Sequence, residues 1–436
     1  MGKIKLHIER IGMRKGRYIK KGGKDMENKL HTPEGVRDIY NVECMKKLAI
    51  QEKLLSILYL FGYQDIQTPT FEYLDVFKKE IGGDPVKELY KFFDNEGNIL
   101  ALRPDITPAV ARCVATLFEE QDLPARLCYV GNTFTNHTSY QGRLKESTQL
   151  GAELIGDASV EADAEMIAIA VKGLNSLGMK DFQVYIGHVD FTSSLLEQTN
   201  LDEETIQKVR HLLANRNYFA IEEILIEKGI DGEVVELFKA LPEFNGEVDI
   251  LNKAAEIAPT EEGRKAIVRL FKIYSLLTAY GVDKHVRFDL SISGKYGYYS
   301  GTVFRIYTQG TGEAIVRGGR YDHMLNVFGK DNPSVGFAII VDSLLTALLR
   351  QNIDVKTRET NIIVYTEATA SKALAMATNF RTKGKSIELI KDDLRNIEEL
   401  VDYGLRKGVS SIFIYLEPEQ AKMINLITGE EQDIVM

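Results

Sequence analysis

Polar side chains at regular spacing in otherwise apolar segments are the residues best suited to bind a ligand. Gln149 and Glu153 alternate with Gly151 along one predicted strand, so both side chains point to the same face of a sheet. The other polar residues in strands or loops that face the same cleft are Asp105, Thr107, Tyr298 and Tyr299. A buried carboxylate is costly unless it is hydrogen-bonded. The spacing therefore predicts a ligand site, a closed hydrogen-bond network or a solvated face.

Common motifs of nucleotide and metal chemistry are absent from the sequence. It contains neither GxxxxGK[ST] nor a paired-histidine metal motif. Gly318-Gly319 is a weak phosphate-loop signal, because the Arg-Tyr-Asp that follows does not start a helix. We interpret GEAIVRGGRYD as a strand followed by a tight turn. The sequence therefore predicts no cofactor, no metal and no catalytic residue of these kinds.

Charge is distributed unevenly along the 436 residues, whose formal net charge is -9. Residues 1–25 hold nine Lys or Arg and two acids, which leaves a net charge of -16 on the rest of the chain. Nucleic-acid binding needs clustered Lys and Arg against phosphates. We therefore expect the body to be a poor general binder of nucleic acid, although a small basic groove is compatible with this balance.

The basic segment 1–25 lacks the apolar stretch of a secretory signal. We interpret it as a disordered tail or as a mis-set start, with translation beginning at Met26; a nucleic-acid-binding arm is the alternative. The three cysteines, Cys44, Cys113 and Cys128, form no CxxC pair, and we expect them to be buried apolar residues. No apolar run of membrane-spanning length occurs, and the expected location is the cytoplasm.

The elements that must position the polar residues follow from apolar periodicity. The Pro- and Gly-marked segment 31–38 leads into an expected helix at about 41–61, which Gly62 ends. The elements expected next are a strand at 64–70, a hairpin at 88–103, a helix at 105–121 and strands at 125–135 and 146–156.

A helix-rich piece is expected at about 160–285. Its part from about 190 to 285 shows helical periodicity without a strand signal and interrupts the series of strands, so we interpret it as an insertion. The elements expected after it are strands at 286–293, 299–308 and 312–316 and a helix at about 335–350. This pattern predicts an antiparallel α+β body.

Strands and helices alternate beyond a linker at 354–360. Strands are expected near 361–365, 385–390 and 411–415, helices near 369–383 and 393–406, and a final element near 421–436. This order is typical of a small α/β domain. We therefore predict three parts: the tail 1–25, an α+β domain at 26–353 and an α/β domain at 354–436.

The ordered motifs of residues 31–436 resemble the histidyl-tRNA synthetase family. HTPEGVRD is similar to the family's opening signature, and IQTPTFEYLDVFKKEIG is similar to class II motif 1, which builds the dimer interface. The other matching segments are LYKFFDNEGNILALRPDITPAVAR, GNTFTNHTSYQGRLKESTQLGAELIG (motif 2), YYSGTVF (the histidine-specific tyrosine motif) and GGRYDHMLNVFGKDNPSVGFAI (the approach to motif 3). The resemblance implies a class II synthetase sheet, with a C-terminal domain like the anticodon-binding domain.

Departures from the family pattern remove three positive charges. Thr135 stands where motif 2 has an Arg that grips ATP, and Ser343 stands where motif 3 has an Arg that clamps it. The histidine-specific Arg aligns with Gly294, beside Lys295, and a flexible ammonium does not reproduce a planar guanidinium. Adenylate formation depends on positioned cations, each commonly worth roughly 10²–10³ in rate. We therefore expect aminoacylation to be lost.

The amino-acid pocket of the family is retained by resemblance. Thr107, Gln149, Glu153 and Tyr299 match positions that contact histidine in the family, Tyr298 belongs to the same motif, and Asp105 replaces a Glu. An acid near the α-ammonium and an acid with a tyrosine near the imidazole suit the donors of histidine. A retained pocket without ATP clamps is what a histidine sensor would show.

This combination resembles the regulatory subunits that pair with the short-form catalytic subunit of ATP phosphoribosyltransferase. The resemblance implies a non-catalytic chain that binds L-histidine as an effector, self-associates through the motif 1 region and joins a hetero-oligomer. The acidic C-terminal domain makes tRNA binding an unfavoured role. The alternatives are a divergent histidyl-tRNA synthetase and a synthetase paralogue with another partner.

Overall fold

The computed structural model describes residues 30–77, 88–137, 144–292, 298–392, 396–417 and 420–435. The interpretation of residues 1–25 lies outside these ranges. The described chain divides into two compact units. The larger contains residues 34–36 and 50–355, and the smaller contains residues 30–33, 37–49 and 356–435. No helix in the described ranges is long and apolar enough to cross a membrane.

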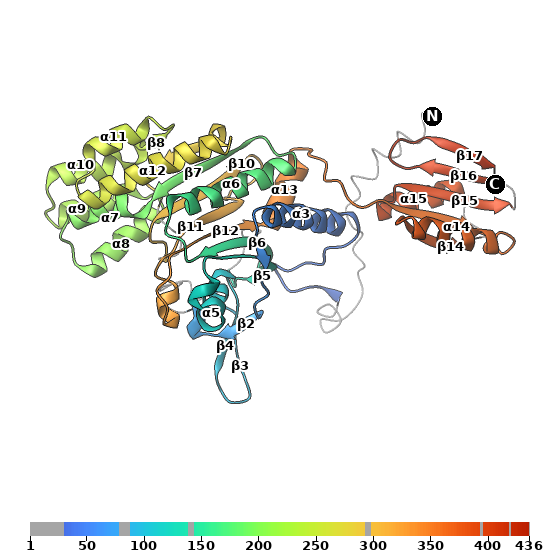
Figure 1. The fold of residues 1–436 in the computed structure, drawn as a ribbon, viewed down its shortest axis with the longest axis horizontal. Helices are drawn as coiled ribbons and strands as arrows, with labels where there is room; N and C mark the ends of the chain where they lie inside the picture. The colour runs from blue at the N-terminus through green and yellow to red at the C-terminus, as the bar shows by residue number, and fades with distance from the viewer. Residues whose placement is uncertain are drawn as a thin grey trace. The chain divides into compact units, whose positions relative to one another are not determined.

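A nine-stranded sheet forms the centre of the larger unit (Figure 1). Its order is β1-β5-β6-β12-β11-β10-β7-β9-β8. Neighbouring strands are antiparallel except for the pairs β1·β5 and β7·β9. The strands are β1 (Gln64–Asp65), β5 (Ala125–Phe134), β6 (Glu146–Ile155), β7 (Phe182–His188), β8 (Asn245–Gly246), β9 (Val286–Asp289), β10 (Thr302–Thr308), β11 (Val316–Arg320) and β12 (Ser334–Ile340).

Helices cover both faces of this sheet. One face packs against α6 (Val160–Ser176), α12 (Glu261–Ala279) and α13 (Val341–Arg350) (Figure 1). The opposite face packs against α5 (Thr107–Leu117), whose Val110 and Val114 join a buried cluster with Leu127 and Tyr129 of β5. A sheet covered on both faces buries apolar side chains on both, which explains why strand alternation is weak in the central strands.

The segment predicted as a helical insertion is helical over most of its length. Its helices are α7 (Val189–Glu197), α8 (Glu203–Ala214), α9 (Tyr218–Glu227), α10 (Gly232–Ala240), α11 (Ile250–Ile257) and α12. Side chains cap several of them; Asp202 accepts from Thr205 N, and Thr260 accepts from Gly263 N. The prediction that this segment contains no strand is wrong at β8, which pairs with β9.

Three further predictions need correction. Residues 335–340, predicted as the start of a helix, form strand β12, and the helix begins at Val341. An apolar run buried on both sides has no periodicity that separates strand from helix. The expected strand at 312–316 lies later, at Val316–Arg320, so Gly318 and Gly319 belong to the strand and not to a turn. Of the three cysteines only Cys128 is buried; Cys44 and Cys113 are half-buried.

A small three-stranded sheet, ordered β2-β4-β3, stands beside the main one. It contains β2 (Phe71–Tyr73), β3 (Lys91–Phe93) and β4 (Ile99–Leu102). The hairpin predicted at 88–103 is confirmed, because β3 and β4 pair antiparallel and Asp94 accepts hydrogen bonds from Glu96 N and Asn98 N in the turn. The hairpin projects from the larger unit (Figure 1).

The smaller unit contains a five-stranded sheet ordered β14-β13-β15-β16-β17. Its strands are β13 (Thr360–Tyr365), β14 (Ser386–Lys391), β15 (Ser411–Glu417), β16 (Gln420–Asn425) and β17 (Glu431–Val435). The first three pair parallel, and the last two join antiparallel. Crossover helices α14 (Ala370–Thr382) and α15 (Ile397–Lys407) connect the parallel strands, as the α/β pattern predicts; helix α3 (Asn41–Leu60) begins in this unit.

Gly318 lies where the sheet has no room for a side chain. A Cβ atom there would lie 2.4 Å from the Phe304 ring and 2.7 Å from the carbonyl oxygen of Gly336. We therefore expect Gly318→Ala to lower the free energy of unfolding by about 1–3 kcal/mol, as overpacking commonly does. Chemical denaturation measures it. Gly232→Ala is the control, because nothing surrounds that position, and an equal loss in both variants would contradict the packing argument.

Candidate functional site

The carboxyl group of Glu153 lies at the centre of a buried polar cluster. It extends from β6 and is 1% exposed. Its Oε1 accepts hydrogen bonds from Thr107 Oγ1 at 2.7 Å and from Tyr129 OH at 3.1 Å. Its Oε2 accepts one from Tyr321 OH. Three elements of the larger unit thus supply a hydroxyl each to one carboxyl, which is the satisfaction that a buried acid requires.

Asp105 supplies a second carboxyl beside the first. Its Oδ1 accepts from the backbone N of Ile106 at 2.8 Å and from Gln149 Nε2 at 3.0 Å. Its Oδ2 accepts from Tyr298 OH at 3.3 Å. Asp105 lies two residues before Thr107, the first residue of α5, so one short turn delivers both polar side chains to the same place.

The sheet register places these side chains on one face. Gly336 of β12 lies opposite Glu153 of β6, and a Cβ on Gly336 would lie 1.7 Å from Glu153 Oε2. Gly319 of β11 lies under Tyr299, where a Cβ would lie 2.7 Å from the tyrosine ring. These two glycines are required because the carboxyl and the ring lie close against the backbone of the neighbouring strands.

The structure brings together all six residues singled out in the sequence. Tyr298 connects them, since its ring lies 4.7 Å from that of Tyr299 and 6.0 Å from that of Tyr321. Sequence reasoning missed Tyr129 and Tyr321. Tyr129 lies on β5 directly opposite Gly151 of β6, and only this pairing of the two strands brings it to the cluster. Tyr321 follows the Gly-Gly-Arg that we interpreted as a turn, and its distance in sequence from Glu153 gave no indication of contact.

The positions where the family's arginines are replaced carry no cation in the described chain. Thr135 lies just beyond β5, where its backbone N donates to Lys145 O at 2.9 Å. Ser343 lies half-buried in the first turn of α13. Gly294 and Lys295 lie outside the described residues. At two of the three positions a short uncharged side chain therefore stands in the folded protein.

Burial controls the ionisation of the central carboxyl. It raises the pKa of Glu153 to about 8, although the hydrogen bonds from Tyr321 and Thr107 act in the opposite direction. Burial likewise raises the pKa of Tyr321. Glu153 therefore titrates near neutral pH, and a bound positive charge would favour its ionised form.

Comparisons with known proteins agree with this fold. Residues 35–344 match the family model described as histidyl-tRNA synthetase. The solved histidyl-tRNA synthetase of Nostoc sp. PCC 7120 superposes with a TM-score of 0.78 at 21% identity, covering 93% of this chain and 96% of that one. At that identity the likeness supports the fold alone. The larger unit thus has the class II aminoacyl-tRNA-synthetase fold, and the predicted α+β class is confirmed.

Sequence relatives define the family more closely. ATP phosphoribosyltransferase regulatory subunits from Acetivibrio thermocellus and Thermoanaerobacter pseudethanolicus are 35% and 37% identical, covering 94% and 86% of this chain and 98% and 99% of theirs. A Bacillus halodurans structure described as an ATP phosphoribosyltransferase regulatory subunit/histidyl-tRNA synthetase has a TM-score of 0.77 at 28% identity, covering 89% of this chain and 98% of that one. The chain belongs to the histidyl-tRNA-synthetase-like family of ATP phosphoribosyltransferase regulatory subunits.

The raised pKa of Glu153 predicts a pH-dependent stability. Between about pH 4.5 and 8 the folded chain holds a proton that the unfolded chain releases, so folding stability falls as pH rises. We expect Glu153→Gln to abolish this dependence, so that the wild type loses stability relative to the variant by about 1.4 kcal/mol per pH unit at most. Urea denaturation of both proteins from pH 5 to 8 measures it. A pH-independent difference between them would contradict the buried, protonated Glu153.

Proposed function

We propose that this chain is the non-catalytic regulatory subunit of ATP phosphoribosyltransferase, which opens histidine biosynthesis. In this proposal the short-form catalytic subunit requires the chain for activity and becomes sensitive to L-histidine through it. The observation that carries the proposal is the intact cluster of Asp105, Gln149 and Glu153 in a fold where Thr135 and Ser343 replace the ATP-binding arginines.

The cluster suits the donors of histidine. The ligand carries an ammonium and imidazole N–H groups, and both need acceptors. When it is ionised, the Glu153 carboxylate has about four lone-pair sites, and the described structure fills three, so capacity for one more donor remains. A ligand ammonium can share Asp105 with Gln149. An incoming cation also offsets the desolvation that keeps Glu153 protonated.

Loss of the arginines argues against the synthetase alternative. Adenylate formation develops negative charge on phosphate oxygens, which oriented cations must stabilise. Thr135 and Ser343 cannot supply that charge. We therefore expect no ATP–pyrophosphate exchange with histidine, and measurable exchange would favour a divergent synthetase.

Feedback control requires histidine to bind two states of the hetero-oligomer with different affinity, and the coupling is reciprocal. In the proposed mechanism, histidine binding changes the contacts of Tyr298 and Gln149 with Asp105. These contacts link the start of α5 to β6 and to the segment that precedes β10. A regulatory signal can leave the site through any of these elements.

The assay of this proposal is the condensation of ATP with phosphoribosyl pyrophosphate by the cognate catalytic subunit, across a histidine titration. We expect activity only when this chain is present, with inhibition by histidine. Gln149→Ala should raise the histidine concentration for half-inhibition by about tenfold or more, the effect of losing one hydrogen bond to a charged group.

Gln207→Ala, on the exposed side of α8, is the matched control and should leave inhibition unchanged. If Gln149→Ala behaves like the control, the histidine pocket is wrongly assigned. If the chain alters neither rate nor inhibition, the synthetase paralogue with another partner is the better hypothesis.

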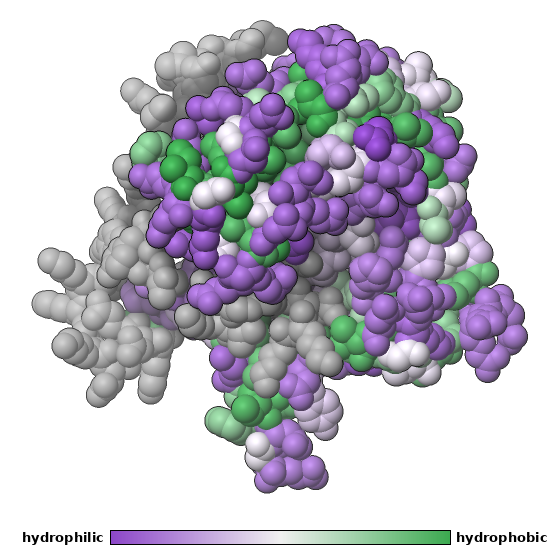
Figure 2. Space-filling view, turned by 90° about the vertical axis from the view of Figure 1, so that its left-hand side faces the viewer, coloured by the Kyte–Doolittle hydropathy of each residue, from purple (hydrophilic) through white to green (hydrophobic). Residues whose placement is uncertain are grey.

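Self-association through the motif 1 region is also part of the proposal. The three-stranded sheet leaves a group of large apolar side chains 37–71% exposed: Phe71, Tyr73, Phe92, Phe93 and Ile99. Figure 2 shows hydrophobic atoms along the projecting hairpin above its hydrophilic tip. Contiguous exposed apolar residues mark interaction sites, and β2 belongs to the motif 1 segment. A second copy of this chain is the proposed occupant.

A charge placed in this apolar group tests the self-association. We expect Phe71→Asp, which also removes an edge-on contact with Phe92 at 5.6 Å, to weaken the dimer roughly 30-fold or more, as loss of a hot spot of about 2 kcal/mol does. Light scattering on a gel-filtration column gives the mass at each concentration. Phe219→Asp is the control, because Phe219 of α9 is also an exposed phenylalanine, 70% exposed against 50% for Phe71. A dimer retained by both variants would exclude this interface.

A further inference from the structure

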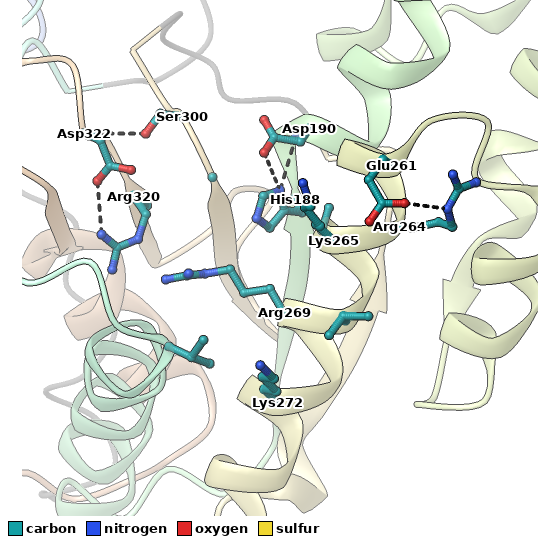
Figure 3. Close-up of a pocket in the computed structure, with 14 residues that line it drawn as sticks. His188, Asp190, Glu261, Arg264, Lys265, Arg269, Lys272, Ser300, Arg320 and Asp322 are labelled. Atoms are coloured by element: carbon teal, nitrogen blue, oxygen red, sulfur yellow. Dashed lines mark hydrogen bonds and ion pairs between the residues drawn. The ribbon is translucent and has the colours of Figure 1, made fainter.

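A cavity of about 660 Å³ lies away from the Glu153 cluster. Its walls come from α12, from the start of α6 and from the ends of β7, β10 and β11 (Figure 3). The register places His188 of β7 beside Thr302 of β10, whose hydroxyl donates to the buried Asp163 of α6. The cavity therefore opens on the face of the sheet that α6 and α12 cover, opposite to Glu153. Its volume is in the range that small-molecule ligands occupy.

Helix α12 contributes a row of cations to this cavity. Lys265, Arg269 and Lys272 follow one another at spacings of four and three residues, which places them on one face of the helix. Arg269 Nε pairs with Asp163 Oδ2 at 2.8 Å. Within the described ranges of the chain, neither lysine has an ion-pair partner. Two ammonium groups thus remain for an anionic ligand in a protein of net charge -9.

His188 adds a buried donor to the same cavity. It is 4% exposed, and burial lowers its pKa to about 4, so the ring is neutral at physiological pH. Its Nδ1 accepts from the backbone N of Asp190 at 3.3 Å, which places the ring proton on Nε2. That Nε2 has no hydrogen-bond partner among the residues that the structure describes. His188 lines the cavity, so this N–H is a donor that a ligand bound there can use.

Carboxylates from elements other than α12 also line the cavity, in addition to Glu261 of α12. Asp190 is the second residue of α7 and has a half-exposed side chain. Asp322 follows the end of β11, and its Oδ1 pairs with Arg320 Nη1 at 3.0 Å. Figure 3 shows Asp190 and Asp322 on the upper side and Arg269 and Lys272 below them. A simple anion would meet repulsion from these acids. Ligand hydroxyls would instead donate to them, as ribose hydroxyls do to acidic residues in dinucleotide sites.

We propose that this cavity binds a small phosphorylated sugar, as the free sugar phosphate or as part of a mononucleotide. The phosphate lies against Lys265, Lys272 and the Nε2–H of His188. The sugar hydroxyls donate to Asp190 and Asp322. Neither a purely anionic nor a purely cationic ligand satisfies both walls. The site is distinct from the proposed histidine pocket, because the two lie on opposite faces of the sheet.

Calorimetric titration of the full chain with ribose 5-phosphate, AMP, inorganic phosphate and ribose tests this proposal. We expect ribose 5-phosphate or AMP to bind more tightly than either phosphate or ribose, and the tighter of the two identifies the source. The Lys265→Gln/Lys272→Gln variant should bind it about tenfold or more weakly, because both charge-assisted hydrogen bonds are lost. Lys208→Gln/Lys253→Gln removes the same charge from exposed positions of the insertion and is the matched control.

The Asp190→Asn variant tests the contribution of the sugar hydroxyls separately from that of the phosphate. It should weaken ribose 5-phosphate severalfold and leave inorganic phosphate unchanged or slightly tighter. Equal affinities in the lysine and control variants, or no preference for the sugar phosphate over phosphate, would overturn the proposal. A further contrary outcome is that the chain binds a transfer RNA but none of the small ligands, and that the lysine variant no longer binds the transfer RNA. Histidine titrations of the same variants report on the other pocket, so failure here leaves the proposed regulatory function separately testable.

Discussion

Two adjacent residues at the end of β11, Arg320 and Tyr321, connect this strand to α6 on one face of the sheet and to Glu153 on the other. Arg320 is buried, and its Nη2 lies 2.6 Å from Asp163 Oδ1 of α6, while Tyr321 donates to Glu153 of β6. Successive side chains of an extended chain point to opposite faces, so this single step fixes a contact on each side of the sheet. A buried guanidinium without its carboxylate costs several kcal/mol. The end of β11 is therefore held in place, and both proposed sites depend on its position.

The buried ion cluster extends this constraint to the helical insertion. Asp163 also accepts from Arg269, so α12 is tied to α6 and to β11 through one carboxylate. The cavity beside it then has rigid walls made from segments that lie far apart in the sequence. The same arrangement joins the insertion to the strand that carries Tyr321, and this is a physical connection between the two proposed sites. Whether they are coupled is decided by binding free energies and not by this proximity.

The requirements of the fold are separable from those of the synthetase chemistry that we propose is lost. The sheet requires glycines such as Gly336 and Gly318, whose replacement would bring a Cβ into contact with buried groups, and these requirements are independent of ATP. By resemblance, Thr135 and Ser343 stand where the synthetases have arginines that bind ATP, so these replacements would affect a ligand and not the core. The function of this chain therefore has to be argued from its site and not from its fold.

The sequence by itself determined the order of motifs, the α/β pattern of the smaller unit, the hairpin and the shared face of Gln149 and Glu153. These features depend on local periodicity and on resemblance. Only the tertiary structure decided that residues 335–340 form a strand, because an apolar run buried on both faces carries no period. It alone placed Tyr321 on Glu153 and His188 in the cavity beside α12. Such contacts join residues from separate elements, and no local pattern in the chain encodes which of those elements meet.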